Sequence, residues 1–342
     1  MHKGRRFFNN LQELRGMAAL LIVMSHIPFF EKLIGPSFGG YGVAIFFLLS
    51  GFLVAYSTQA GNRSFLIKRS IRILPVYYMM TFLTYILVVI KPSLFNTTTA
   101  NPVYLIKSLL FVPYVNPNGI VRPILDVAWA LLPEVWLYLL YWIVMKVSHK
   151  YRNEIALTIL CIVFFMGELF VRNNLIYNQY RFSCLTFAIG ILIYIVWLSK
   201  KTTVKITVVE CKCKWKWMLC SLFFWSAGVI YNCLIQSGIG IISLLLPAVV
   251  FVCYLINEST LCNSKTIMSV GTFSYSLYLS HEFVVKGFSR LLFSLDETTM
   301  KNFLLSLMCI VIALIVGFIV NQFFEKPATK FLTKIFIGSD KK

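Results

Sequence analysis

The segment LQELRGMAALLIVMSHIPFF, residues 11–30, decides the fold class, because it is a long apolar run with one arginine near its start and one histidine near its end. About 20 apolar residues are what an α-helix needs to span a bilayer. In one continuous helix, Arg15 and His26 would lie within about 20° of the same face and about 16 Å apart along the axis. A charge at that depth faces a protein interior or a wet cavity rather than lipid. The segment therefore predicts a membrane helix with a functional polar face.

The composition extends this prediction to the whole chain. Hydrophobic residues make up 58% of the 342 residues and charged residues 13%, and the mean hydropathy is +0.78. These values exclude an ordinary soluble domain and indicate a polytopic membrane protein. Runs of about 20 apolar residues predict an all-α fold with about ten transmembrane helices, near residues 11–30, 41–58, 74–92, 125–147, 155–171, 182–199, 217–235, 239–257, 268–290 and 302–324. We expect a single transmembrane domain over residues 1–342, with no fused extracytoplasmic domain, and an interfacial or re-entrant piece at 104–115.

The formal net charge of +19 is explained by the positive-inside rule and not by nucleic-acid binding. With the N-terminus in the cytoplasm, most of the 32 lysines and arginines fall in inner segments. This asymmetry predicts that both termini are cytoplasmic in a multi-pass protein of the inner (plasma) membrane, with basic loops against anionic lipids. The nine cysteines lie mostly in predicted spans or inner loops, so we expect reduced thiols, and we expect no metal site.

Three other predicted spans carry polar residues that a bilayer disfavours. Glu134 lies directly after a proline near the middle of the fourth span, which makes it a functional candidate by default. Ser274, Tyr278 and His281 recur at spacings of four and three residues in the ninth span and predict one polar stripe on a helix. Ser50 interrupts the apolar run of the second span. Helix packing through small residues and hydroxyls is the alternative explanation for these positions.

Arg69 and Arg72 precede the third span and share one face if that segment is helical. Such a pair suits a phosphate group, since guanidinium groups form bidentate, charge-assisted hydrogen bonds with it. Positive-inside anchoring is the alternative for both. Taken singly, Arg15 can equally reach the headgroups, and His26 can be a packing residue. The shared face of Arg15 and His26 is what favours a function.

These segments, in this order, resemble acyltransferase family 3, a group of membrane proteins that includes bacterial O-acetyltransferases of surface polysaccharides. The resemblance covers nearly the whole chain and rests on an ordered set of short motifs: LRG at 14–16 with ten residues between Arg15 and His26, FFLLSGF at 46–52, Arg69 and Arg72 before Pro75, residues 129–138 around Glu134, SYSLYL at 274–279 and EKP at 325–327. It implies transfer of an acyl group, usually acetyl, from cytoplasmic acyl-CoA to a hydroxyl of an outer or lipid-linked glycan. Acetyl-CoA would be a donor substrate, and no permanently bound cofactor is expected.

This activity assigns roles to the polar residues. We predict that His26 acts as general base on the acceptor hydroxyl, with Glu134 orienting its imidazole, and that His281 is the alternative base. Three arginines are predicted to bind the phosphates of the donor: Arg15, Arg69 and Arg72. Three side chains are candidates to support the developing oxyanion: Arg15, Ser50 and Tyr278. A covalent route through Ser25, Ser50 or a tyrosine is less favoured, because no nucleophile-elbow pattern accompanies them.

The sequence is also compatible with two other classes of protein. A transporter or channel would use the same intramembrane histidine, glutamate and arginine residues as an ion or proton path. A membrane scaffold of a polysaccharide assembly complex would tolerate the loss of His26. If the chain is an enzyme, it either acylates its acceptor directly or passes the group to a separate extracytoplasmic partner.

Overall fold

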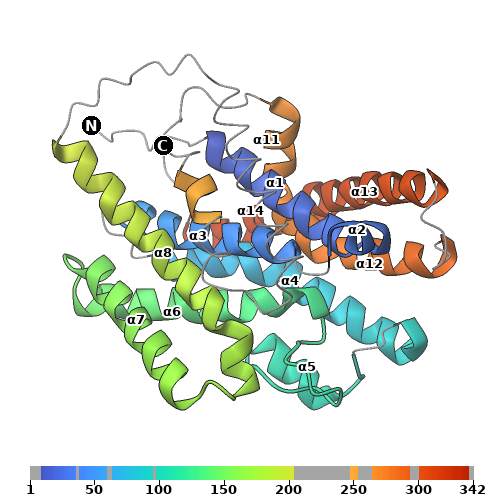
Figure 1. The fold of residues 1–342 in the computed structure, drawn as a ribbon, viewed down its shortest axis with the longest axis horizontal. Helices are drawn as coiled ribbons and strands as arrows, with labels where there is room; N and C mark the ends of the chain where they lie inside the picture. The colour runs from blue at the N-terminus through green and yellow to red at the C-terminus, as the bar shows by residue number, and fades with distance from the viewer. Residues whose placement is uncertain are drawn as a thin grey trace.

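The computed structural model describes residues 9–35, 38–59, 64–94, 98–203, 247–252, 264–292 and 300–338 of the chain. Regular structure in these ranges is helical, apart from one isolated bridge between Val115 and Val121. The α-helices are α1 Asn9–Ser25, α2 Pro28–Ile34, α3 Gly39–Ser57, α4 Phe65–Ile90, α5 Pro102–Leu109, α6 Leu131–Val147, α7 Arg152–Phe170, α8 Leu175–Thr203, α11 Lys265–Thr272, α12 Ser274–Leu292, α13 Met300–Val320 and α14 Lys326–Phe336 (Figure 1). The all-α fold class predicted from the sequence is confirmed.

Six of the described helical segments are long and apolar enough to cross a membrane, or seven if the bent pair α1 and α2 counts as one span. The protein is therefore a multi-pass membrane protein. Apart from residues 247–252, the predicted spans at 217–235 and 239–257 lie outside the described residues. The total of ten spans and the cytoplasmic termini stay predictions. We call the end of the bundle at which α1 begins the N-terminal end.

The first predicted span, 11–30, is not one helix. α1 ends at Ser25, and α2 leaves it at an angle of 96°. Pro28 occupies the first turn of α2, and the residue before it, Ile27, has extended backbone angles, as the ring of a following proline requires. His26 therefore lies in the turn after α1, and the prediction that it shares a helix face with Arg15 is wrong.

The ninth predicted span, 268–290, is also broken. It consists of α11 and α12, which meet at Phe273. α11 packs closely on α1, where a Cβ atom added to Gly271 would lie 2.0 Å from the carbonyl oxygen of Gln12. α12 is instead hydrogen-bonded to α4, because the Tyr275 hydroxyl donates to the carbonyl of Ile73, at 2.7 Å. The break places the first turn of α12 in the middle of the helix bundle.

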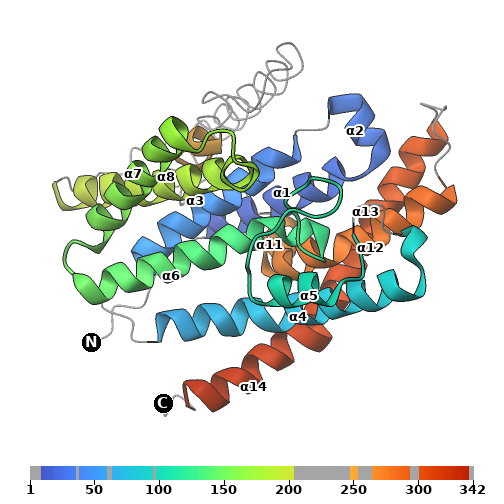
Figure 2. The same cartoon turned by 90° about the horizontal axis from the view of Figure 1, so that it is seen from below.

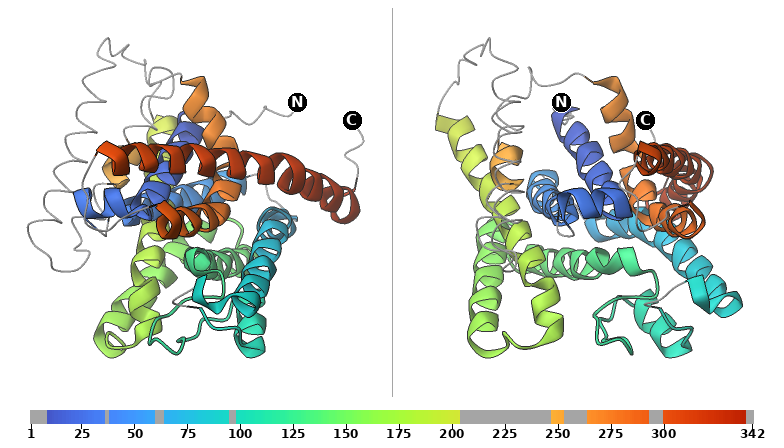
Figure 3. Two further views of the ribbon diagram at one scale, coloured as in Figure 1. Left: turned by 90° about the vertical axis from the view of Figure 1, so that its right-hand side faces the viewer. Right: turned by 45° about the vertical axis from the view of Figure 1, so that its right-hand side comes forward.

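Other boundaries differ less from those expected. α4 begins at Phe65, so the basic segment before the third predicted span is helical. The fourth predicted span, 125–147, consists of a 3₁₀ turn, η2 (Asp126–Ala130), and α6. The last predicted span, 302–324, continues through a π-helical turn, Asn321–Glu325, into α14, and the left panel of Figure 3 shows α13 and α14 as one long rod. α14 also contacts α4, and Figure 2 shows it running at an angle beneath that helix.

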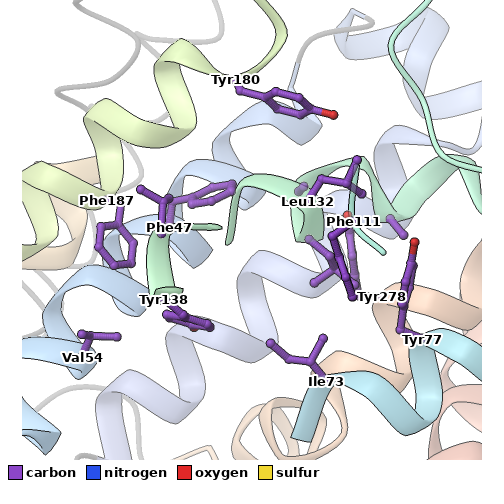
Figure 4. Packing of buried hydrophobic residues seen from close by; sticks show 14 of the residues in the cluster. Phe47, Val54, Ile73, Tyr77, Phe111, Leu132, Tyr138, Tyr180, Phe187 and Tyr278 are labelled. Carbon is purple, nitrogen blue, oxygen red and sulfur yellow. The ribbon is translucent and has the colours of Figure 1, made fainter. Parts of the chain in front are cut away.

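α3 lies at the centre of the bundle, between α1 and α8. Gly51 of α3 and Gly190 of α8 face each other's backbone, since a Cβ atom at Gly51 would lie 2.1 Å from the Phe187 carbonyl oxygen, and one at Gly190 2.3 Å from that of Leu48. Aromatic rings fill the adjoining core, where Tyr138 and Phe187 have centroids 6.3 Å apart (Figure 4). Small residues at this crossing let the two helices approach closely.

Gly51→Ala is expected to destabilise the protein by about 1–3 kcal/mol, because the added methyl group overlaps the backbone of α8. Gly40→Ala in the same helix is the matched control, since a Cβ atom there meets no atom within 4 Å. Thermal unfolding in detergent measures both. Equal melting temperatures for the two variants would contradict the close crossing.

Candidate functional site

Side chains from α1, α3, α4, α6, η2 and α12 surround a cavity of about 90 Å³ inside the bundle. We call it the arginine cavity. Tyr138, Ile73 and Tyr278 are three of its lining residues and are drawn in Figure 4. Its polar lining residues are Arg15, Ser50, Arg69, Arg72, Glu134, Tyr138, Ser274, Tyr275 and Tyr278. It therefore combines six of the eight residues that the sequence proposes for the site.

Glu134 is held by two hydroxyl groups in this cavity. Its Oε1 atom accepts a hydrogen bond from Ser50 Oγ at 2.7 Å and one from the Tyr138 hydroxyl at 2.5 Å. The residue lies in the first turn of α6, where the helix dipole favours a negative charge. Tyr138 was not among the site residues proposed from the sequence, although its spacing of four from Glu134 on a helix was an available signal.

The arginine cavity is rich in positive charge. Arg15 comes from α1, and Arg69 and Arg72 come from the first two turns of α4. The Arg69 guanidinium lies over the ring of Tyr138, 4.8 Å from its centroid. Within the described ranges, none of the three arginines forms a salt bridge with a carboxylate. With one carboxylate against three cations, the cavity suits an anionic ligand.

His26 lies outside this cavity, in the turn between α1 and α2. Its Nδ1 atom is 2.7 Å from the carbonyl oxygen of Ile22 and 3.3 Å from Ser25 Oγ. A carbonyl only accepts, so Nδ1 carries the hydrogen and Nε2 of the neutral ring has a free lone pair. This tautomer is the one that a general base acting through Nε2 needs.

His26 lines a second, largely polar cavity of about 200 Å³, which we call the histidine cavity. Its other lining residues are Arg122, Asp126, Val127, Trp129, Glu282, Val285 and Lys286. His281 is fully buried beside it, with its ring centroid 4.9 Å from that of His26. The Nδ1 atom of His281 donates to the Tyr278 carbonyl at 2.7 Å, and its Nε2 atom has no hydrogen-bond partner among the described residues.

The wall between the two cavities is thin. The Ile22 side chain lines the arginine cavity, while its carbonyl orients His26. Tyr278 likewise lines the arginine cavity and donates its hydroxyl hydrogen to the carbonyl of Val127, a residue of the histidine cavity. One helical turn of α1 and one tyrosine thus separate the cationic side from the imidazole.

The structure does not bring all the proposed residues together as expected. Glu134 binds Ser50 and Tyr138, and the predicted hydrogen bond from Glu134 to the His26 imidazole is not formed among the described residues. The bend before Pro28 carries His26 away from the face of α1 that lines the arginine cavity. The sequence reasoning also missed the charged residues of the histidine cavity: Arg122, Asp126, Glu282 and Lys286.

Tyr138→Phe removes one of the two hydroxyl donors to Glu134, and the turnover rate of the protein is expected to fall about tenfold. Ser50 still holds the carboxylate, so folding is expected to be unaffected. The rate at saturating substrate, with melting temperature as the control, measures the effect. An unchanged rate would show that the position of Glu134 does not matter for turnover.

The apolar helices enclose a cationic cavity and a second polar cavity, which a thin wall separates. These features define a membrane protein that is suited to binding a polar ligand in its interior. The chain belongs to acyltransferase family 3: the model of that family, described as an acyltransferase domain, matches residues 8–322. This confirms the resemblance drawn from the short motifs and shows a membrane acyltransferase. No curated protein and no solved structure gives a significant match to the chain.

Proposed function

We propose that the chain is an O-acetyltransferase of the inner (plasma) membrane that moves acetyl from cytoplasmic acetyl-CoA to a hydroxyl of an extracytoplasmic or lipid-linked glycan. The observation that carries this proposal is the pair of cavities. Three arginines without carboxylate partners among the described residues line one cavity, and an imidazole with a free Nε2 lone pair lines the other. An acyl-CoA matches this arrangement, because it has anionic phosphates at one end and a reactive thioester at the other.

The donor side is assigned to the arginine cavity and the N-terminal end of the bundle. Arg69 and Arg72 suit bidentate bonds to phosphate oxygens, because they lie one turn apart on α4. Arg15, in the second turn of α1, is proposed to bind the donor and to stabilise the oxyanion of the transition state, together with Ser50 or Tyr278. The paired hydroxyls around Glu134 keep one negative charge fixed among these cations.

The chemical step is assigned to the thin wall between the cavities. The acceptor hydroxyl gives its proton to Nε2 of His26 as its oxygen attacks the thioester carbonyl. The carbon–sulfur bond then breaks, and the CoA thiolate leaves and takes up the proton. The Ile22 carbonyl, rather than Glu134, holds the imidazole in the required tautomer. His281 is proposed as a supporting residue, because its ring packs against that of His26.

Labelled acetyl-CoA and a cell-envelope glycan fraction, given to the purified protein in detergent, test this proposal. We expect label on the glycan that mild alkali releases, as an O-acetyl ester requires. Uptake of a labelled solute by the reconstituted protein, with no acylated product, would contradict the proposal and favour a transporter.

A further inference from the structure

The histidine cavity contains four charged side chains that form two ion pairs, each between residues four positions apart in the chain. Arg122 Nε lies 3.0 Å from Asp126 Oδ1, and the Lys286 ammonium pairs with the Glu282 carboxylate. The charges therefore cancel, in contrast to the excess of cations in the arginine cavity. Each cation of the histidine cavity already has an anion, so a charged ligand would have to separate a pair. A neutral ligand with many hydroxyls can instead donate to the carboxylates and accept from the cations.

Trp129 supplies an aromatic surface to the same cavity. Its side chain is half-buried, and the Arg122 guanidinium lies over one face of the ring, 5.0 Å from the centroid, so a ligand would use the other face. A large ring with an apolar face suits the CH face of a sugar, while the neighbouring charged groups suit its hydroxyls. The volume of about 200 Å³ is below the range of about 300–1,000 Å³ of pockets for drug-sized ligands. The cavity therefore suits one small unit and not an extended chain.

The cavity is held in shape by contacts between segments that are far apart in the sequence. Glu282 is 5% exposed and accepts a hydrogen bond from the Val127 backbone N–H at 3.3 Å. Tyr278, one turn earlier on α12, donates to the Val127 carbonyl. The backbone N–H and the backbone carbonyl of Val127, in η2, are thus both hydrogen-bonded to side chains of α12. A site fixed in this way loses little freedom when it binds a ligand.

We propose that the histidine cavity is the acceptor site and that it binds one neutral hexose unit of the glycan, with a single hydroxyl directed at Nε2 of His26. The inference rests on the proposed function and adds the chemical class of the acceptor. Asp126 and Glu282 accept hydrogen bonds from the other sugar hydroxyls, and Trp129 contacts the ring. A uronic acid is disfavoured, because its carboxylate would compete with Asp126 or Glu282 for a cation.

Acetyl transfer to methyl hexosides, compared with the matching methyl uronides, tests the acceptor site. The variant is Asp126→Asn. Asp126 is half-exposed, so its substitution disturbs folding less than a substitution of the buried Glu282 would. Its matched control is Glu168→Gln, which loses the same charge from an ion pair with Arg181, at 2.7 Å, outside the cavity. We expect the acceptor KM to rise about tenfold in Asp126→Asn, with the acetyl-CoA KM unchanged and Glu168→Gln like the wild type.

Equal acceptor KM values for Asp126→Asn and the wild type would overturn the inference, and so would preferred use of the uronides. If the wild type transfers no acetyl to any glycan, the proposed function fails, and ligand binding decides the inference separately. Quenching of tryptophan fluorescence by the methyl hexosides, lost in Trp129→Phe, would still support a neutral sugar site. Identical titrations of the wild type and Trp129→Phe would overturn it.

Discussion

His26→Ala is expected to reduce acetyl transfer by about 10²–10⁴-fold, the range that a positioned general base contributes. The Ile22 carbonyl fixes the ring so that Nε2 is free, and no other described imidazole lines the histidine cavity. Binding of acetyl-CoA is expected to stay the same, because the donor is assigned to the arginine cavity. Transfer rates at saturating donor, together with direct binding of acetyl-CoA, measure the two effects.

His149→Gln is the matched control for this experiment. Among the described histidines, His149 lies outside the site. Its Nε2 atom is hydrogen-bonded to the Thr58 carbonyl, at 3.1 Å. Its loss is expected to leave transfer at the wild-type level in protein of equal stability. Retained transfer in His26→Ala would contradict the assignment and move the chemistry to His281 or to a covalent residue such as Ser25 or Ser50.

Arg69→Ala is expected to raise the KM for acetyl-CoA by about 10–100-fold, because a charge-assisted hydrogen bond to a phosphate contributes about 1.5–3 kcal/mol. Arg69→Lys is expected to restore only part of the affinity, since an ammonium group does not form the bidentate contact and stacks less well on Tyr138. Donor KM values at fixed acceptor measure both variants.

Lys68→Ala provides the matched control on the same helix. Lys68 is adjacent to Arg69 and carries the same charge, but it is exposed and does not line the arginine cavity. Its substitution is expected to leave the donor KM unchanged. If Lys68→Ala and Arg69→Ala have the same effect, the arginines act through the general positive charge of this end and not as a donor site.

The membrane fold and most of the arginine cavity could be predicted from the sequence, because both depend on local patterns. Apolar runs define helices, and Arg69 and Arg72 share one face once α4 is known to begin before them. Glu134 and Ser50 were identified because polar residues in apolar segments are unusual. Each of these signals lies within a single segment.

The histidine cavity could not be predicted, because it forms only where distant segments meet. Val127 and Glu282 are 155 positions apart in the chain, and nothing local indicates that they are hydrogen-bonded. The separation of His26 from Glu134 did have a local signal in Pro28, since the residue before a proline avoids the helical conformation. Treating residues 11–30 as one straight helix hid that signal.

In the proposed function, the donor and the acceptor bind at opposite sides of a thin wall and enter from opposite sides of the membrane. Protein reconstituted in one orientation in liposomes tests it, with labelled acetyl-CoA on one side only and the glycan on the other. We predict that label reaches the glycan only when acetyl-CoA is on the side of the N-terminal end. Equal labelling from either side, or transfer only when both substrates share one side, would contradict the claim.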